Sequence, residues 1–569
     1  MSMRHPATVP SELRPAGRGG WVPAIAAVLA GFVAAANLVS ALTPDFAARA
    51  RLLRGLEPAP LFHALAVPAA AALGLTAIFL AKRRHRAWLL ALVLMVALGA
   101  FDLLKGLDVE EAVLTWSAVG LLWWGRESFG VVGGPVPLRG ALAFAGGVLA
   151  GSFALAAAAC WAALHGRPPV GLVLRETADW LLWRAGPTPL AGHDELRLVP
   201  LGVEFLSAAA LLAAGWALFR PHRPSQAPPT PAARRAAVHL VRAHGTDTLS
   251  FFKLRTDKQY LFSPCGRAFL GYRVVHGVLL VSGDPVGPQD ALPPLVARLL
   301  DLVERHGLRV AVVGAGEGTL ELWRAAGLRT LYLGDEAIVD TERLSLEGRK
   351  VRKLRQSVNR LVKAGYAAEL YRHEDLDDAQ LAELEEVSEA WLDGAPDRGF
   401  SMAMDGLRGA HHTGSVIVTA RHEDGTLGGF LHFVPAYGRP AMSLGYMRRR
   451  PETPNGLTEF MVVRSVQLLR ERGVEQVSLN FCAFGRWLRE PSNVLQRLAG
   501  RILVPLDGVF QIHSLLDFNE KFATRWAPRH IAFAGWLSAP RVALAALEAE
   551  GQLPRPALPS LPRQLVRAA

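Results

Sequence analysis

The chain has 569 residues, a formal net charge of +12 and an isoelectric point near 10.0, so we expect several domains and an anionic partner. Hydrophobic residues make up 51% of it, which indicates that part of the chain lies in lipid. The three cysteines, Cys160, Cys265 and Cys482, form no close pair, which argues against a disulfide framework and a zinc ribbon.

Residues 1–219 contain apolar runs near the ~20 residues that a helix needs to cross a bilayer core. We predict six spans, at Trp21–Leu42, Leu61–Ala81, Ala87–Leu104, Ala112–Gly125, Ala141–Leu164 and Val199–Phe219. The first run is too long for a signal peptide and lacks a clear cleavage site. This half is therefore expected to be a multi-pass α-helical membrane domain.

The loops between these runs differ in charge. Lys82–Arg86, the start of the chain and the residues after Phe219 are basic, whereas Asp102–Glu111 is mostly acidic. Because basic loops stay on the cytoplasmic side, both ends of a six-span domain are expected in the cytoplasm. The basic loop around Arg51 does not follow this rule.

Residues 220–235 form a proline-rich stretch that we predict to be a semi-stiff linker, and residues 541–569 are a tail. Between them, residues 236–540 are predicted to form a soluble α/β domain. Its predicted helices are Ala236–Arg242, Ala291–Arg305, Gly318–Ala326, Asp377–Leu392 and Leu457–Arg472. Its predicted strands are Phe269–Val275, Val278–Ser282, Arg309–Val313, Ala367–Tyr371, Val416–Arg421, Gly428–Val434, Ala441–Met447 and Val477–Phe481. This order repeats in outline, which indicates two related α/β lobes with mixed sheets.

A basic segment, Arg349–Lys363, lies between the predicted halves of this domain and contains no carboxylate. Its apolar residues recur at helical spacing, so we expect an amphipathic helix with one face in a core; they are Val351, Leu354, Val358, Leu361 and Val362. A solvated surface helix would explain the pattern equally well. The missing i,i+4 acids favour a surface for phosphates, of lipid headgroups or of RNA.

Several other motifs carry less weight. The glycines of Gly314–Gly318 follow a strand but lack a Walker lysine and the dinucleotide spacing. His411 and His412 have no matching third ligand, so a surface loop is favoured over a metal site. Cys482 is expected to be a buried thiol. We expect neither a metal nor a cofactor.

The segment Leu444–Phe460 combines a strand end, three arginines, a turn rich in proline and glycine, and a helix start. Such a junction is a common ligand site in α/β proteins. Arg448 is a candidate for holding a phosphate or carboxylate, and Glu459 for holding an amine. A helix with an ordinary first-turn glutamate is the alternative.

Residues 236–535 resemble the catalytic domain of the phosphatidylglycerol lysyltransferase (multiple peptide resistance factor) family. The resemblance rests on many short pieces in order: Gly283-Asp284-Pro285, Gly334-Asp335-Glu336-Ala337, Leu346-Glu347-Gly348-Arg349-Lys350, Leu354-Arg355, Asn359-Arg360, Gly399-Phe400-Ser401, Met447-Arg448, Asn455-Gly456, Glu459-Phe460, Ser478-Leu479-Asn480-Phe481, Phe518-Asn519-Glu520-Lys521-Phe522, Trp526 and Pro528-Arg529. The mix is most similar to the actinobacterial branch, in which a lysyl-tRNA synthetase is fused to this domain; no synthetase follows in this sequence.

The resemblance implies tandem acetyltransferase-like (GNAT) lobes that move an aminoacyl group, usually lysyl, from aminoacyl-tRNA to phosphatidylglycerol. This would occur at the inner face of the cytoplasmic membrane. Since the tRNA ester is already activated, neither ATP nor a metal is required. The implied partners are charged tRNA, an anionic phospholipid and the membrane, and homo-oligomerisation stays open. The product lipid carries less negative charge, which would weaken the attraction of cationic peptides.

The resemblance also assigns roles. Arg448 and Glu459 are the expected catalytic residues, and the expected substrate-binding residues are Arg352, Lys353, Arg355, Asn359, Arg360, Asn480, Lys521 and Arg529. One position departs from the family: Gly445 stands where the family strand carries an active-site Asp. Either Glu459 or Asp405 replaces that Asp, or the substrate has changed, or activity is lost.

Two alternatives follow from this departure. The first is an inactive, membrane-anchored binding protein that keeps the fold. The second is a transferase that uses another donor, such as acyl-CoA, although no glycine-rich pyrophosphate loop is present at the expected turn.

Overall fold

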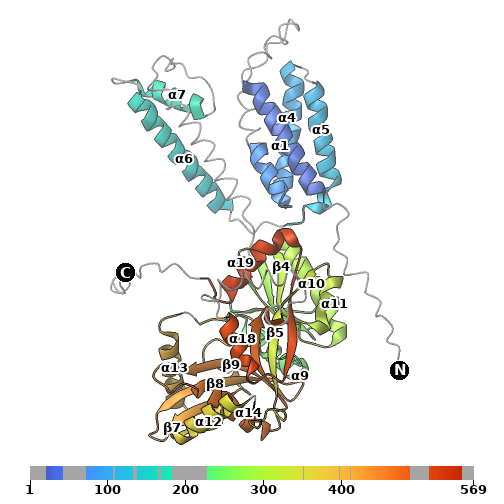
Figure 1. Ribbon diagram of the computed structural model, residues 1–569. Helices are drawn as coiled ribbons and strands as arrows, with labels where there is room; N and C mark the ends of the chain where they lie inside the picture. The colour runs from blue at the N-terminus through green and yellow to red at the C-terminus, as the bar shows by residue number, and fades with distance from the viewer. Residues whose placement is uncertain are drawn as a thin grey trace, which may run out of the picture. The chain divides into compact units, whose positions relative to one another are not determined.

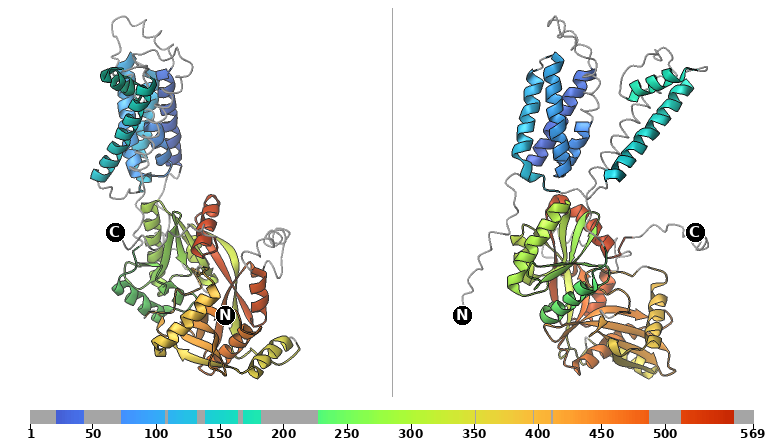
Figure 2. Two further views of the ribbon diagram at one scale, coloured as in Figure 1. Left: turned by 90° about the vertical axis from the view of Figure 1, so that its left-hand side faces the viewer. Right: turned by 180° about the vertical axis from the view of Figure 1, so that it is seen from behind.

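The computed structural model describes most of the chain (Figures 1 and 2). The described residues are 21–42, 72–106, 109–131, 138–163, 168–181, 227–349, 351–395, 397–409, 412–486 and 512–553. They belong to two compact units, one within residues 16–224 with 304–307, and one within 225–303 and 308–569 together with 1–15.

The first unit is helical. Its described helices are α1 (Val22–Leu42), α4 (His85–Gly106), α5 (Val109–Trp124), α6 (Leu138–Ala163) and α7 (Val170–Leu181). Residues 72–80 are also helical. Side chains from α1, 72–80, α4 and α5 share one apolar cluster.

The prediction of a multi-pass membrane domain is wrong for the described residues. None of their helices combines the length and the apolar character that crossing a bilayer would take. Helix α5 has 16 residues and α7 has 12, fewer than the ~20 that a bilayer core requires. The described part of the predicted span 61–81 is helical only over 72–80, and the predicted span 199–219 lies outside the described residues.

The second unit is built on one mixed sheet of eleven strands, in the order β1-β2-β3-β4-β11-β5-β10-β9-β8-β7-β6. The strands are β1 (Gln259–Phe262), β2 (Phe269–Val275), β3 (Val278–Ser282), β4 (Arg309–Gly316), β5 (Arg329–Asp340), β6 (Tyr366–Arg372), β7 (Val416–His422), β8 (Leu427–Ala436), β9 (Ala441–Arg449), β10 (Gln476–Ala483) and β11 (Arg525–Phe533). This confirms the mixed sheet of the predicted acetyltransferase-like fold.

The sheet consists of two similar lobes that exchange one strand each. In lobe 1 a parallel pair, β3 and β4, follows an antiparallel hairpin; in lobe 2 the parallel pair is β9 and β10. The last strand of lobe 1, β5, pairs with β10, and the last strand of lobe 2, β11, pairs with β4. Strands β5 and β11 also pair with each other, so the two lobes form one continuous sheet.

Helices cover both faces of the sheet. They are α9 (Pro231–His244), α10 (Leu292–His306), α11 (Leu320–Ala325), α12 (Arg352–Lys363), α13 (Asp378–Leu392), α14 (Leu457–Arg470), α18 (Ile512–Glu520) and α19 (Ala539–Ala549). In lobe 1, α10 and α11 pack on one face and α19 on the other. In lobe 2, α12 and α14 pack on one face, and α9 and α13 on the other.

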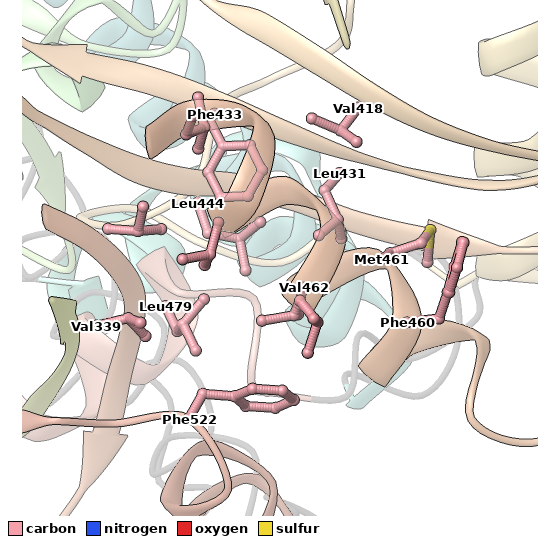
Figure 3. Close-up of a cluster of buried hydrophobic side chains, with 14 of the residues drawn as sticks. Val339, Val418, Leu431, Phe433, Leu444, Phe460, Met461, Val462, Leu479 and Phe522 are labelled. Carbon is pink, nitrogen blue, oxygen red and sulfur yellow. The ribbon is translucent and has the colours of Figure 1, made fainter. Parts of the chain in front are cut away.

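The core beneath α12 and α14 joins residues from both lobes (Figure 3). Val339 of β5 and Leu479 of β10 lie in the same cluster as Phe460 of α14, and all three are almost completely buried. Strand exchange therefore places a lobe 1 strand inside the lobe 2 core, which makes the lobes depend on each other.

The predicted elements are present with small shifts, and three strands were missed. The hairpin at His276-Gly277 is confirmed, with both residues in the left-handed region that a two-residue turn requires. Helix α9 begins at Pro231, inside the predicted linker, because Thr230 caps its first turn. The missed strands are β1, β5 and β11.

The exchange predicts that the two lobes unfold together. Phe533→Ala in β11 should lower the free energy of unfolding by about 3–5 kcal/mol, because it empties a buried position beside α19. Hydrogen exchange followed by mass spectrometry should show faster exchange in β4 of lobe 1 and in β10 of lobe 2. Faster exchange confined to lobe 1 would contradict a single cooperative sheet.

Candidate functional site

The parallel strands β9 and β10 separate after a short paired stretch. They are in register only from Ala441–Ser443 to Gln476–Ser478. Beyond these residues β9 pairs only with β8, and β10 only with β5. The backbone N–H and C=O groups on the facing edges of β9 and β10 are therefore not paired with each other beyond Ser443 and Ser478. Arg448 and Asn480 lie in these separated parts of the two strands.

A bulge in β9 decides which face Arg448 occupies. His432 of β8 lies opposite Tyr446, and Phe433 lies opposite Leu444, so Gly445 is an extra, unpaired residue. Before the bulge, Leu444 faces the α14 core; after it, Tyr446 belongs to the opposite core with α13. The one-residue shift turns Tyr446 and Arg448 to the α13 face. Without the bulge, regular alternation would place both side chains on the α14 face, together with Leu444.

Arg448 is held by two neighbours on that face. One terminal nitrogen donates to Asp397 at 2.5 Å, and the guanidinium lies 4.9 Å from the ring centre of Tyr446. Its side chain is 13% exposed. Burial, with the nearby Asp397 carboxylate, raises the pKa of Tyr446, so its phenol stays neutral at physiological pH.

Two polar atoms at this point lack partners. Within the described part of the chain, neither Nε of Arg448 nor the hydroxyl of Tyr446 has a hydrogen-bond partner, although both are buried. Buried donors without partners are rare, because they give up hydrogen bonds to water without replacement. Both atoms can donate, so the pair suits an anionic oxygen of a ligand.

His432 occupies the space beside Gly445. A Cβ at Gly445 would stand 2.6 Å from Nδ1 of His432, which is closer than real side chains approach. His432 is completely buried and continues a row of rings, with His412 5.3 Å and Tyr446 5.7 Å away, centre to centre. His412 in turn stacks on His373. The expectation that His412 lies in a surface loop is wrong, because it is fully buried in this row.

The row of histidines does not form a metal site. No group of three or more His, Cys, Asp and Glu in the described ranges could hold a metal ion. His373 instead bonds the carbonyl of Leu407 at 2.6 Å. Burial lowers the pKa of His373, so its ring is neutral at pH 7 and acts as packing and as a hydrogen-bonding group.

Glu459 lies on the other side of the sheet from Arg448. It is in the first turn of α14, where its carboxylate pairs with the Lys521 ammonium at 2.9 Å. Arg360 of α12 closes the same corner by donating to the carbonyl of Asn455 at 2.5 Å. The structure therefore gathers Glu459, Lys521 and Arg360, but it places Arg448 in a separate group with Asp397.

Helix α12 confirms the predicted amphipathic pattern in part. Leu354, Val358 and Leu361 are buried, whereas Val362 is 53% exposed and Val351 is the residue before the helix. With 3.6 residues per turn, Val362 falls outside the apolar stripe that the other three define.

The cations of α12 divide into two kinds. Arg355 donates to the carbonyl of Leu346 at 2.6 Å, and Arg360 is bound as described, so both fix backbone. Arg352, Lys353 and Asn359 are exposed, and Arg352 and Lys353 have no ion-pair partner in the part of the chain that the structure describes. Lys363, the last residue of the helix, is exposed as well, so Arg352, Lys353 and Lys363 face solvent.

Arg529 lies in a buried network instead of at an open surface. Nε of Arg529 donates to Glu336 at 2.9 Å, and one terminal nitrogen donates to Asp247 at 2.6 Å and to Thr248 at 2.8 Å. Arg529 is 5% exposed. Because its guanidinium is paired with carboxylates on two sides, Arg529 stabilises the pairing of β11 with β5. Asn480 lies at a bulge of β10, and its side chain is outside the described positions.

In lobe 1, the parallel strands β3 and β4 correspond to β9 and β10, and the place beyond their paired stretch is filled by side chains. Asp284, just after β3, accepts hydrogen bonds from the backbone N–H of Gly316 at 3.1 Å and from Thr319 beyond β4. Burial, with the nearby Asp247 carboxylate, raises the pKa of Asp284 to about 6, and burial lowers that of Lys253 to about 8. Buried side chains thus fill the lobe 1 position, whereas lobe 2 offers unpaired donors.

Residues 238–533 match the protein family described as phosphatidylglycerol lysyltransferase, C-terminal, which is more than half of the chain. The chain belongs to this family. Among curated proteins, it is 33% identical over 579 residues to the lysylphosphatidylglycerol biosynthesis bifunctional protein LysX of Mycobacterium sp. (strain KMS), an alignment that covers 96% of this chain and 52% of that protein. The LysX protein of Nocardia farcinica (strain IFM 10152) is 34% identical over 431 residues, covering 73% of this chain and 38% of that protein.

The chain spans about half the length of these curated relatives. Among solved structures, L-PGS from Bacillus licheniformis is 24% identical, with a TM-score of 0.52; the alignment covers 58% of this chain and 99% of that one. This likeness supports the fold of the phosphatidylglycerol lysyltransferase family.

Sequence reasoning missed the residues that position Arg448. Asp397 follows α13 in an irregular segment, and His432 lies in the middle of a strand, so no spacing pattern linked them to Arg448. Asp405, suggested as a replacement for the missing Asp, accepts from the backbone N–H of Thr256 at 2.7 Å. The bulge could have been suspected from Gly445, since a glycine inside a strand often marks one.

The contact between Gly445 and His432 predicts a site-specific loss of stability. Gly445→Ala should lower the free energy of unfolding by about 1–3 kcal/mol, because the new methyl group overpacks a filled core. Gly318→Ala is the matched control: no atom lies within 4 Å of its added Cβ, and its effect should be near zero. Adding His432→Ala to Gly445→Ala should recover part of the loss in thermal unfolding. Equal effects of the two glycine variants would refute the packing.

Proposed function

We propose that this protein transfers an aminoacyl group, with lysyl as the expected group, from aminoacyl-tRNA to phosphatidylglycerol at the inner face of the cytoplasmic membrane. The family match over residues 238–533 and the similarity to the lysylphosphatidylglycerol biosynthesis proteins LysX support it. The observation that carries it is the pair of buried, unpartnered donors on Arg448 and Tyr446, where β9 and β10 diverge.

The reaction needs positioning and charge stabilisation. A glycerol hydroxyl oxygen forms a bond to the ester carbonyl carbon, and the bond from that carbon to the tRNA ribose oxygen breaks. The hydroxyl proton ends on the ribose oxygen that leaves. Between these events negative charge collects on the carbonyl oxygen, and donors aimed at that oxygen lower the barrier.

Arg448 and Tyr446 fit that requirement. Asp397 fixes one end of the guanidinium and leaves Nε to donate to a lipid phosphate or to the developing oxyanion. The neutral Tyr446 hydroxyl is a second buried donor, on a ring that lies against the same guanidinium. Because both are held by packing before a substrate arrives, little reorganisation is needed on binding.

Glu459 is proposed to hold the ammonium group of the transferred amino acid. It already binds an ammonium, that of Lys521 at 2.9 Å, in the first turn of α14. A substrate amine would have to displace Lys521, whose side chain is 44% exposed and therefore free to move toward solvent. Because Glu459 and Arg448 lie on opposite faces of the sheet, a substrate that reaches both would have to extend between β9 and β10, which pair only over Ala441–Ser443.

The exposed cations of α12 are proposed to contact phosphates of the tRNA donor. A polyanion that reaches Arg352 and Lys353 releases counterions, which adds affinity without sequence preference. The resulting lipid carries less negative charge, so the product would lower the attraction of cationic peptides to the membrane.

The first prediction concerns Arg448. Lipids from cells that express the protein should contain aminoacylated phosphatidylglycerol by mass spectrometry, and Arg448→Ala should reduce it at least about 100-fold, as loss of an oxyanion donor does. Arg267→Ala, which removes an exposed arginine paired with Asp290, should leave the amount unchanged.

The mass of the new lipid would identify the amino acid. Absence of any aminoacylated lipid, with the protein folded and charged tRNA present, would favour an inactive or altered protein, as the glycine at position 445 suggests. Full product with Arg448→Ala would remove Arg448 from the mechanism.

The second prediction concerns α12. Replacing Arg352 and Lys353 together by Gln should weaken tRNA binding and reduce the slope of log K against log salt by about 2, since two phosphate contacts are lost. Replacing Arg470 and Arg472, exposed at the end of α14, removes the same charge and is the control. Equal slopes for the two double variants would show that only net charge matters.

A further inference from the structure

One end of the second unit presents apolar side chains to solvent. Leu537 is 97% exposed and Trp536 is 59% exposed, in the 3-10 turn Trp536–Ser538 that leads into α19. Leu544, two turns along α19, is 45% exposed, and Pro540 and Ala543 of the same outer surface are also exposed. A large leucine left in water at a turn tip loses the burial free energy that it could gain elsewhere.

The inner face of α19 explains why the helix is held in this position. Val542, Ala545 and Ala549 are buried against β3, β4 and β11. The carbonyl of Leu537 accepts a hydrogen bond from Arg309 at 3.2 Å. The turn is therefore fixed to the sheet, and its exposed side chains are presented on a rigid support.

The charges around this turn are basic. Arg541 lies in the first turn of α19, Arg309 begins β4, and Arg329 begins β5 opposite Phe533. The acids of the helix and its cap, Glu548 and Glu550, lie at its far end, where Glu548 pairs with His276 and Glu550 accepts from the backbone of Phe400 and Ser401. Tryptophan and leucine rimmed by arginines match the composition of segments that enter an anionic lipid interface.

We infer that the turn Trp536–Ser538 and the start of α19, the α19 tip, dock on an anionic lipid surface, with Trp536 and Leu537 entering the interface and Arg309, Arg329 and Arg541 contacting headgroups. This deepens the proposed function, because it names the surface through which the protein meets its lipid acceptor.

Docking through the α19 tip would also fix the direction in which α12 faces. Within the second unit, α19 and α12 lie at opposite ends in all views (Figures 1 and 2). A protein docked through the α19 tip therefore turns Arg352 and Lys353 away from the lipid. Of the two phosphate sources considered for the basic helix, lipid headgroups and RNA, docking selects RNA.

A fluorescent probe at the tip tests the inference. Leu537→Cys would be labelled with an environment-sensitive dye in the full chain after Cys265→Ser, since Cys265 is the exposed cysteine and Cys160 and Cys482 are buried. The dye emission should shift to the blue on vesicles of equal parts phosphatidylcholine and phosphatidylglycerol, and less on phosphatidylcholine alone. A dye at Glu471, exposed in lobe 2, is the control and should not respond.

A substitution gives the matching loss. Leu537→Glu should weaken binding to the mixed vesicles at least about tenfold, because it replaces an inserted leucine by a carboxylate that anionic lipid repels. Its near-complete exposure means that the fold should not change. Trp391→Gln, which removes an exposed tryptophan of α13, should bind as the wild type does.

Turnover separates this inference from the proposed function. Leu537→Glu should lower aminoacylation of vesicle lipid about tenfold and leave aminoacylation of a monomeric short-chain phosphatidylglycerol unchanged. If the proposed function is wrong, neither lipid is aminoacylated, yet the dye still reports docking. An unresponsive dye on anionic vesicles would overturn the inference, as would a blue shift without vesicles. If the blue shift without vesicles grows with protein concentration, the tip binds a second copy of the protein. If that shift is the same at all protein concentrations, the tip binds another part of the same chain.

Discussion

The pairing of β11 with β5 is the interaction on which the second unit depends. Each of these strands completes the other lobe, and their shared register is reinforced by a buried ion pair between Arg529 and Glu336. Glu336 lies opposite Ala527, two residues from Arg529, which is the diagonal spacing that side chains on one face can bridge. A one-residue slip would turn the guanidinium away from its carboxylates, and leaving a buried charge unpaired is strongly unfavourable. The ion pair therefore selects one register.

The two lobes share a plan but use it differently. In lobe 1, Asp284 bridges from the end of β3 to the backbone at the end of β4, and buried charges fill this position. In lobe 2, a bulge at Gly445 turns Arg448 and Tyr446 to the α13 face, where Asp397 holds the arginine. Two donors there keep no partner within the described residues. Among the described residues, the same architecture thus has a position bridged by Asp284 in lobe 1 and two unpartnered donors in lobe 2.

Charge is also divided between places with different roles. The arginine and carboxylates of the β5/β11 junction are buried, so their energies are set by desolvation and pairing. Arg352, Lys353 and the arginines near α19 are at the surface, where a charge attracts anions over a longer range. The net charge of +12 therefore does not show how many cations are available to an anionic partner, since some basic residues are paired with carboxylates inside the protein.

The sequence by itself determined the local elements of the second unit and the family. Alternation, turn residues and helical spacing, which act over a few residues, predicted the hairpin at His276-Gly277, the amphipathic α12 and all the strands except β1, β5 and β11. Ordered short motifs were enough to indicate the phosphatidylglycerol lysyltransferase family. Apolar composition was misleading for the described part of residues 1–219, because a high overall hydropathy does not ensure that any one helix combines sufficient length with sufficient apolar character.

Tertiary structure alone decided the rest. Strands β5 and β11 were missed because their partners come from the other lobe, and no local pattern encodes such a pairing. Three features depend on residues that are distant in sequence. They are the burial of Arg529 among carboxylates, the bulge at Gly445 that changes which face the following side chains occupy, and the contact of His432 with that glycine. Arg448 could be named from its motif, but its face, its partner Asp397 and its separation from Glu459 are properties of the assembled sheet.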